Sequence, residues 1–148
     1  MVALSTVEDT RSFGRRLGAV LRAGDLVVLS GPLGAGKTAL AQGIGAGLGI
    51  PGEVTSPTFV IARVHRGGRV PLVHVDAYRL GTTVEVDDLD LDASVEDSVT
   101  VVEWGHGKVE QLAEAYLEVR IDRRDDDTRE VALVPHRGDW ATRIADLS

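Results

Sequence analysis

The chain has 148 residues, of which 43% are apolar and 26% are charged, as in ordinary globular domains and unlike a disordered chain. Its 23 acidic and 16 basic residues give a formal net charge of −7, so its surface is a poor binder of nucleic acid or anionic membrane. It contains no cysteine, which excludes disulfides, thiolate catalysis and cysteine-ligated metal sites. It has neither an apolar run of membrane-spanning length nor a signal-peptide pattern at its N-terminus. We therefore expect one soluble, cytoplasmic domain over residues 1–148.

A helix is predicted near the N-terminus. Ser5 and Glu8 have the Ser-x-x-Glu spacing of a capping box, in which each side chain satisfies an otherwise unpaired backbone amide. The apolar residues that follow fall on one helical face; they are Phe13, Leu17, Val20 and Leu21. Gly24 and Asp25 are expected to separate this helix from the next element.

The next segment predicts a strand, a glycine-rich turn and a second helix. The wholly apolar run 26–29 is typical of a strand buried on both faces, as in a parallel sheet. Residues 31–36 form the turn, and 37–48 have the small and apolar residues of a packed helix. Gly49 and Pro51 are expected to end that helix.

The rest of the chain is richer in strands. Five segments have strand character; they are 59–64, 70–75, 99–102, 116–121 and 130–134. Gly67-Gly68 between the first two and the polar turn 123–128 between the last two predict hairpins. Asp139 is expected to cap a short C-terminal helix and 108–113 to be helical, whereas the acidic stretch 85–97 is left unassigned. The order of elements predicts an α/β domain with a mainly parallel central sheet plus antiparallel hairpin strands.

Residues 31–38 carry the strongest chemical signal. Gly-Pro-Leu-Gly-Ala-Gly-Lys-Thr fits G-x-x-x-x-G-K-[ST], the P-loop, so we predict a three-layer P-loop NTPase rather than a plain connecting turn. The glycines let successive backbone amides point at phosphate oxygens, and the following helix adds its positive N-terminal end. Lys37 should reach the β- and γ-phosphates, and the Thr38 hydroxyl should bind Mg²⁺. The predicted nucleotide-binding residues are Gly31, Pro32, Leu33, Gly34, Ala35, Gly36, Lys37, Thr38, Ala39 and, further along, Thr58.

A P-loop needs a carboxylate near its metal, usually at the end of a buried strand. Asp76 and Glu103 both stand at such ends. Either carboxylate, taken alone, is more often a solvated strand terminus. The residues do not indicate which of the two holds Mg²⁺ and which positions water.

The residues around these carboxylates allow two interpretations each. His74 would share a strand face with Asp76, but a single strand histidine is usually a core or edge residue. Arg79 could neutralise phosphate charge, although a surface ion pair is the commoner role. The loop 55–58 is either a nucleotide-sensing segment or an ordinary turn. Trp104 is either a core aromatic or a lid over the site.

Five motifs in this order identify a family. They are Gly-Asp-Leu-Val at 24–27, the P-loop at 31–38, Ser-Pro-Thr-Phe at 56–59, His-Val-Asp-Ala-Tyr-Arg-Leu at 74–80, and Glu-Trp at 103–104. Together they resemble the bacterial TsaE (YjeE) family, small P-loop ATPases required for threonylcarbamoyladenosine formation in tRNA. The resemblance extends from about residue 6 to residue 104 and more loosely to the C-terminus.

The resemblance implies roles for particular residues. Lys37 and Thr38 match the residues that hold nucleotide and magnesium, and Glu103 matches the carboxylate beside the metal. Asp76 matches the essential aspartate of the His-x-Asp motif, and Thr58 lies in the switch-like segment. The family also implies ATP and Mg²⁺ as cofactors and TsaD and TsaB as partners. Such partners would hold the tRNA, which this acidic chain would meet only indirectly, and no membrane is involved.

The combined hypothesis is a Mg²⁺-dependent ATPase in which Lys37, Glu103 and Asp76 are the catalytic residues. Thr38 and Glu103 would position the metal, and Asp76 would orient water or metal ligands. We expect slow turnover without partners, because no arginine is a convincing finger within the chain. Two alternatives remain. One is a P-loop small-molecule kinase, in which Arg123 and Arg124 would be the candidates for an arginine-bearing lid. The other is a binding protein that uses ATP as a switch without hydrolysing it.

Overall fold

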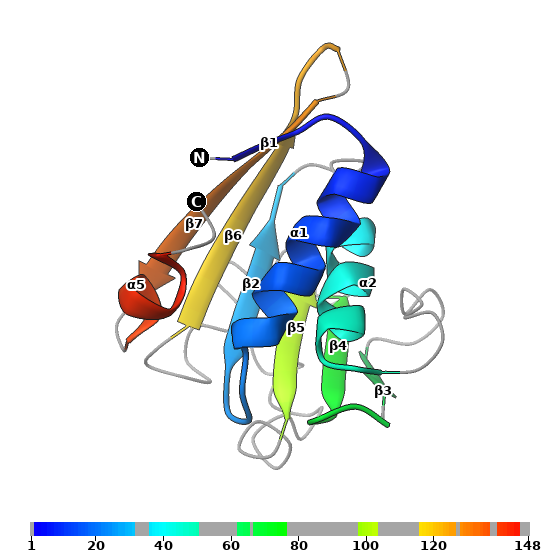
Figure 1. Ribbon diagram of the computed structural model, residues 1–148, viewed down its shortest axis with the longest axis vertical. Coiled ribbons are helices and arrows are strands. Elements are labelled where there is room, and N and C mark those ends of the chain that lie inside the picture. Colours follow the sequence, from blue (N-terminus) through cyan, green and yellow to red (C-terminus); the bar gives the residue numbers. More distant parts are fainter. Residues whose placement is uncertain are drawn as a thin grey trace.

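The computed structural model describes residues 2–31, 36–50, 62–65, 67–76, 98–103, 116–126, 128–136 and 139–145. Its strands are β1 (Val2–Leu4), β2 (Leu26–Ser30), β3 (Ala62–His65), β4 (Leu72–Asp76), β5 (Val99–Glu103), β6 (Tyr116–Arg123) and β7 (Arg129–His136). Its helices are α1 (Val7–Val20), α2 (Lys37–Gly47) and α5 (Trp140–Arg143). The described helices lie against one face of the sheet (Figure 1).

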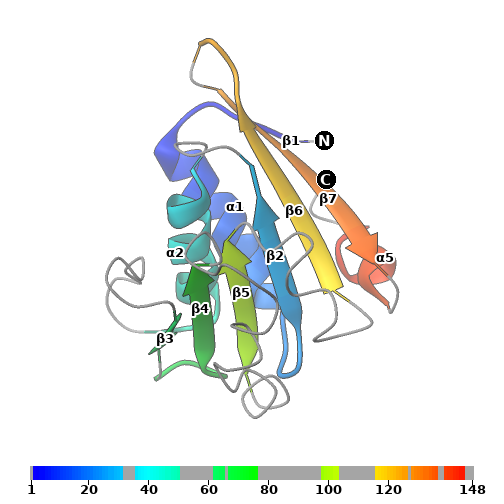
Figure 2. The same cartoon turned by 180° about the vertical axis from the view of Figure 1, so that it is seen from behind.

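The strands form one sheet in the order β1-β7-β6-β2-β5-β4-β3. Its centre is parallel, because β2 pairs in parallel with both β5 and β6, and β4 pairs in parallel with β5. The β3–β4 and β6–β7 pairs are antiparallel, and β1 adds antiparallel to β7. The predicted α/β class with a mainly parallel sheet and hairpin strands is therefore confirmed. Figure 2 shows the sheet from the side opposite the helices.

The central strands are buried on both faces, as their unbroken apolar sequence predicts. Each residue of the run 26–29 has at most 1% of its surface exposed, and Val101 and Val102 on β5 are equally covered. Successive strand residues point to opposite faces, so β2 and β5 are shielded on both sides. On the helix side, the sheet residues form a single apolar core with Phe13, Leu17, Leu40 and Ile44.

Helices α1 and α2 pack with their backbones in close approach. Gly14 and Gly18 of α1 face Gly43 and Gly47 of α2, and a Cβ added at any of the four would lie 2.2–2.5 Å from a backbone carbonyl oxygen of the other helix. No side chain larger than hydrogen fits at these positions. The two helices thus form a tightly fitted pair in front of β2, β5 and β4 (Figure 1).

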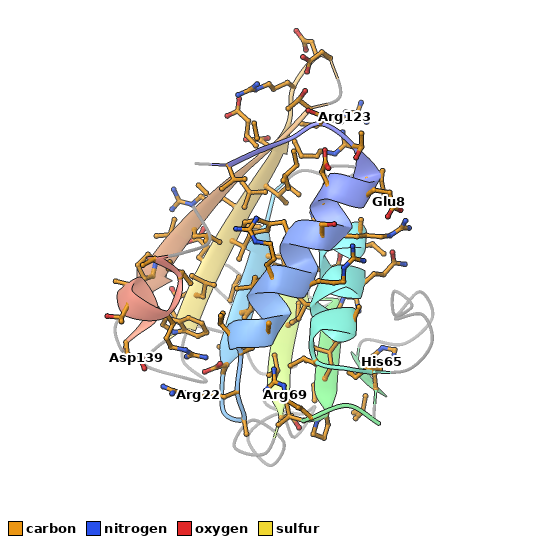
Figure 3. All side chains as sticks on the ribbon, in the orientation of Figure 1. Glu8, Arg22, His65, Arg69, Arg123 and Asp139 are labelled. Atoms are coloured by element: carbon orange, nitrogen blue, oxygen red, sulfur yellow. The ribbon has the colours of Figure 1, made fainter. Side chains whose placement is uncertain are left out.

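Arg69 forms hydrogen bonds with the C-terminal ends of both helices. Arg69, in the β3–β4 connection, donates to the carbonyl oxygens of Gly18 (2.9 Å) and Leu21 (3.0 Å) at the end of α1 (Figure 3). Its own backbone amide donates to Leu48 O at the end of α2 (2.8 Å). One residue therefore donates hydrogen bonds to carbonyl groups at the C-terminal ends of both helices.

The start of α1 differs by one residue from the prediction. Thr6, not Ser5, is the N-cap, and its hydroxyl accepts a hydrogen bond from the Asp9 amide (3.0 Å). Glu8 does not complete a capping box, because its carboxylate binds Arg11 at 2.7 Å. The predicted box is therefore wrong, although the helix and its buried face are confirmed.

Two other differences concern the ends of the chain. Sequence analysis did not predict β1, whose three residues are too few to show a pattern, and it exists through pairing with β7. Asp139 stands at the N-cap of α5, as predicted, but makes no side-chain capping bond. Its carboxylate instead accepts from Arg22 at 2.7 Å (Figure 3). The interpretations of Pro51, 85–97 and 108–113 lie outside the described residues.

Candidate functional site

The carboxyl ends of three parallel strands meet at one edge of the sheet. The β4–β5 register places Asp76 opposite Glu103, and the β2–β5 register places Glu103 opposite Leu29. Beyond this edge, β2 leads through the glycine-rich segment to the N-terminus of α2, which lies at the same end of the molecule (Figure 2). In parallel α/β sheets this is the edge where ligands bind.

The glycines at both ends of the P-loop have clear steric reasons. A Cβ on Gly31 would lie 2.1 Å from the backbone oxygen of Ile121 on β6, so the strand leaves no room for a side chain. Gly36, the N-cap of α2, has φ +107°, a left-handed conformation that only glycine adopts readily. Both glycines let the chain turn tightly from strand into helix.

Lys37 projects back across the loop that precedes it. The side chain is buried, and its Nζ donates to the carbonyl oxygen of Gly31 at 2.6 Å. The ammonium charge therefore lies within the span of the loop, beside the positive N-terminal end of the eleven-residue helix α2. An ammonium and a helix N-terminus at one place form an arrangement suited to phosphate.

Thr38 and Glu103 are brought together from elements 65 residues apart. The Thr38 hydroxyl faces Glu103 Oε1 at 3.4 Å, and Glu103 is buried at the end of β5. The second oxygen, Oε2, lies 3.0 Å from Nε2 of the fully buried His74. This row of three side chains includes one residue, His74, for which sequence analysis had favoured a core or edge role.

Other predicted site residues are placed only in part. Ala39 lies in the first turn of α2, next to Thr38. The backbone of Asp76 ends β4, level with Glu103, whereas its side chain lies outside the described part of the structure. The remaining interpretations also lie outside it; they concern Pro32, Leu33, Gly34, Ala35, Thr58, the loop 55–58, Arg79 and Trp104.

The side chains that are placed fit a hard divalent cation. Thr38 and Glu103 both present oxygen, which Mg²⁺ prefers, and one ion bound at about 2.1 Å can bridge oxygens up to roughly 4 Å apart. Their 3.4 Å separation lies inside that limit. Within the described ranges there is no group of three or more histidine or acidic side chains that could hold a metal alone. Mg²⁺ usually keeps several waters and is bound through one or two protein oxygens plus substrate phosphates, and this pair of side chains suits that mode of binding.

A second buried carboxylate lies on the other side of β2, and sequence analysis missed it. Glu118 on β6 accepts hydrogen bonds from Arg120 Nε (2.8 Å) and from the Ser30 hydroxyl (3.1 Å), and its other oxygen lies 3.1 Å from His136 Nε2. Ser30 is the last residue before Gly31. Its burial depends on the sheet order, which places β6 between β2 and β7.

The Glu118 cluster is balanced electrostatically. Burial alone would raise the pKa of this carboxyl, but hydrogen bonds from Arg120, His136 and Ser30 outweigh that effect and hold the pKa below its ordinary value of 4.5. Tyr116 stacks on the His136 ring, with centroids 4.3 Å apart. Glu118 is thus an anion whose partners connect the β6–β7 hairpin to Ser30, the residue that precedes the P-loop.

The fold and this edge define a class. A central parallel strand, a glycine-rich loop and a lysine that begins the next helix form the fold of the P-loop nucleotide-binding proteins. Residues 4–131 match the family described as Threonylcarbamoyl adenosine biosynthesis protein TsaE, and the chain belongs to that family. The family resemblance expected from the motifs is therefore confirmed.

Individual relatives agree with this assignment. The chain is 61% identical over 145 residues to the tRNA threonylcarbamoyladenosine biosynthesis protein TsaE of Streptomyces coelicolor, covering 93% of this chain and 97% of that protein. Its identity to the Bacillus subtilis protein of the same name is 41% over 127 residues, covering 85% and 79%. The crystal structure of Bacillus subtilis YdiB superposes with a TM-score of 0.80 at 32% identity, covering 99% of this chain and 91% of that one. In the described part of the chain, no helix is long and apolar enough to cross a membrane.

Proposed function

We propose that this chain is a Mg²⁺-dependent ATPase that acts in the cytoplasm with TsaD and TsaB to form threonylcarbamoyladenosine in tRNA. One observation carries the ATPase part of the proposal. Thr38 and Glu103 bring two oxygen ligands within 3.4 Å of each other, next to the residue whose ammonium lies across the P-loop. The pathway follows from membership of the TsaE family.

The phosphate end of ATP would bind at the N-terminus of α2. Lys37 and the backbone amides of the loop would stabilise the charge that develops on the terminal phosphate as the β–γ bond breaks. The N-terminus of α2 is held in place before the ligand arrives, because α2 is packed against α1 by close glycine contacts. Such preorganised groups stabilise a transition state without rearranging.

Thr38 and Glu103 are the residues that would hold Mg²⁺. When bound, the ion neutralises phosphate charge and orients the terminal phosphate. Glu103 suits this role because its described contacts are a hydroxyl and an imidazole, neither of which fully offsets its charge. Asp76, level with Glu103 on the neighbouring strand, would orient the attacking water or a metal-bound water.

Slow turnover by the isolated chain is part of the proposal. Arginine fingers in P-loop enzymes raise turnover by about 10³- to 10⁵-fold, so a chain that lacks one is slow until a partner completes the site. The arginines of the β6–β7 tip do not suit this role well, because the Arg124 side chain binds Glu130 across the hairpin. TsaD and TsaB are the proposed source of the missing organisation.

ATP hydrolysis measured with and without TsaD and TsaB tests this proposal. We expect release of free phosphate that needs Mg²⁺ and rises when both partners are added. Lys37→Ala should abolish tight nucleotide binding while the circular-dichroism spectrum stays unchanged. Equal rates with and without the partners would contradict the partner-dependent step, and a collapsed spectrum for Lys37→Ala would show a structural role instead.

The two alternatives give different results in the same assays. A small-molecule kinase would transfer phosphate to a metabolite and release little free phosphate. A binding switch that does not hydrolyse ATP would support tRNA modification equally well with Asp76→Ala, provided that the variant still binds ATP. Two measurements therefore separate the three functions. One is whether phosphate is released free or transferred to a metabolite, and the other is complementation by this variant.

A further inference from the structure

His74 is the least exposed polar residue next to the proposed metal site. It lies on β4 with 0% of its surface exposed, and the β4–β5 register places it opposite Val101, two residues before Glu103. Its Nε2 is 3.0 Å from Glu103 Oε2. A polar ring at full burial needs a hydrogen bond to offset the loss of water, and Glu103 provides it.

The other ring nitrogen indicates where the proton resides. Nδ1 of His74 is buried and makes no hydrogen bond within the described structure. A proton on Nδ1 would be a buried donor without an acceptor, which is costly, whereas an unprotonated Nδ1 loses less. A proton on Nε2 instead forms a charge-assisted bond to the carboxylate. The geometry thus favours the tautomer in which Nε2 donates to Glu103.

The two carboxylate oxygens of Glu103 therefore have different partners. His74 occupies Oε2, and Oε1 faces Thr38. The terminal torsion of a glutamate has a broad energy minimum, so the carboxylate plane turns easily unless a neighbour fixes it. A neutral donor fixes the plane and leaves the negative charge in place, whereas an arginine would also offset that charge.

We propose that His74 is a positioning residue that holds the Glu103 carboxylate with Oε1 directed at the metal side of the site. The proposal rests on the proposed function, because it gives the carboxylate its role toward Mg²⁺. Partners that orient a metal ligand in this way typically contribute about 10- to 100-fold to metal affinity or activity. A histidine that merely filled the core would contribute to stability and not to the response to Mg²⁺.

Variants at His74 separate positioning from packing. In His74→Gln the amide nitrogen stands about as far along the side chain as Nε2, so it can still donate to Glu103. His74→Asn has the same amide on a chain one methylene shorter, and His74→Leu has similar bulk without a donor. Thr100→Val is the control. Thr100 is buried on neighbouring β5 and pairs with Val73 rather than His74 in the register, and within the described part of the chain its hydroxyl has no hydrogen-bond partner.

The experiment measures binding of a non-hydrolysable ATP analogue by calorimetry, with Mg²⁺ and with EDTA. The wild-type protein and Thr100→Val should gain affinity from Mg²⁺. The Asn and Leu variants should lose about 10- to 100-fold of that gain, with EDTA affinities changed by less than about 3-fold, and Gln should recover most of it. ¹⁵N NMR of the wild-type imidazole should show the neutral tautomer protonated on Nε2, a readout independent of nucleotide.

The outcomes distinguish this proposal from the proposed function. If the folded Asn or Leu variant gains as much from Mg²⁺ as the wild type, or if the proton resides on Nδ1, the positioning role is overturned and the ATPase proposal stands. If the wild type itself gains nothing from Mg²⁺, the proposed metal site fails and the positioning role fails with it. Should Leu not fold, the contrast between Gln and Asn decides, because both variants place the same polar group in the core.

Discussion

Glu103 and Glu118 are two buried carboxylates on the strands that flank β2, and they differ in the groups that offset their negative charge. Glu103 lies level with Leu29 and Glu118 with Val28, so the two emerge on opposite faces of the sheet. Each contacts a hydroxyl next to or within the P-loop and a histidine on a neighbouring strand.

Among the contacts of the described residues, only Glu118 also has a guanidinium, from Arg120 at 2.8 Å. Its charge is therefore matched within the fold, whereas the described contacts of Glu103 are a hydroxyl and an imidazole. A buried anion without a matching cation is costly to the fold. The difference indicates that Glu118 serves the architecture around the loop and that Glu103 is kept for a cation that arrives with a ligand.

The largest expected effect is on activity at Glu103. Glu103→Gln keeps the shape and one acceptor oxygen but replaces the other with an amide donor and removes the charge that would hold Mg²⁺, so we expect Mg²⁺-dependent ATP hydrolysis to fall by about 10²- to 10³-fold. The free energy of unfolding should change by less than about 1 kcal/mol, because the described contacts of this charge include no cation. Steady-state phosphate release and urea unfolding measure the two quantities. Unchanged hydrolysis would remove Glu103 from the site.

At Glu118 we expect a larger effect on the free energy of unfolding than on the response to Mg²⁺. Glu118→Gln removes a charge-assisted bond from Arg120 and weakens two others, so we expect a loss of about 1–3 kcal/mol in the free energy of unfolding. The Mg²⁺-dependent gain in nucleotide affinity should stay within about 3-fold of the wild type, because the charge at Glu103 is intact. Urea unfolding and calorimetry are the measurements. A loss of Mg²⁺ response without a loss of stability would contradict the proposed division between the two carboxylates.

A pH series sharpens the same contrast. The folded pKa of Glu118 lies below its ordinary value of 4.5, so its contribution to stability is fully present above pH 4.5 and is lost as pH falls through the folded value. The difference in unfolding free energy between the wild type and Glu118→Gln should therefore shrink as the pH falls below about 4.5. Urea titrations at each pH provide this difference. A difference that stays the same in acid would show that the ionised carboxylate is not what stabilises the fold.

The smallest effect is expected at Ser30. Ser30→Ala removes one of the three hydrogen bonds to Glu118, so we expect a loss of about 1 kcal/mol in unfolding free energy. In the Glu118→Gln background the same substitution should cost less, because a neutral acceptor is weaker. A double-mutant cycle by urea unfolding measures this coupling. Equal costs in both backgrounds would mean that Ser30 does not act through Glu118.

Sequence patterns predicted those elements whose formation depends on residues close together in the chain. The apolar run 26–29, the glycine-rich turn and the small residues of α2 act within a few positions of one another, and their strand and helix formed as predicted. The capping of α1 and α5 was predicted less well, because the competing partners are side chains. Glu8 binds Arg11, and Asp139 binds Arg22 from 117 residues away.

The candidate site shows the same limit. Lys37 and Thr38 were predicted because the P-loop is a contiguous motif, and Glu103 because it ends a buried strand. The contact of His74 with Glu103 joins residues 29 apart and depends on β4 lying next to β5, which spacing alone does not specify. The burial of Glu118 likewise depends on β6 lying between β2 and β7.

The close contact between α1 and α2 has a consequence for ligand binding. With glycine backbones touching at two successive turns, α2 cannot slide or roll along α1 without a collision of main-chain atoms. The end of α2 that faces the P-loop is thus immobilised when the chain folds, and an arriving anion finds its amide donors already aligned. The entropy cost of ordering these donors is therefore incurred during folding and does not oppose the binding of an anion. Four glycines in the contact between α1 and α2 produce this effect, although they lie away from the end of α2 that faces the P-loop.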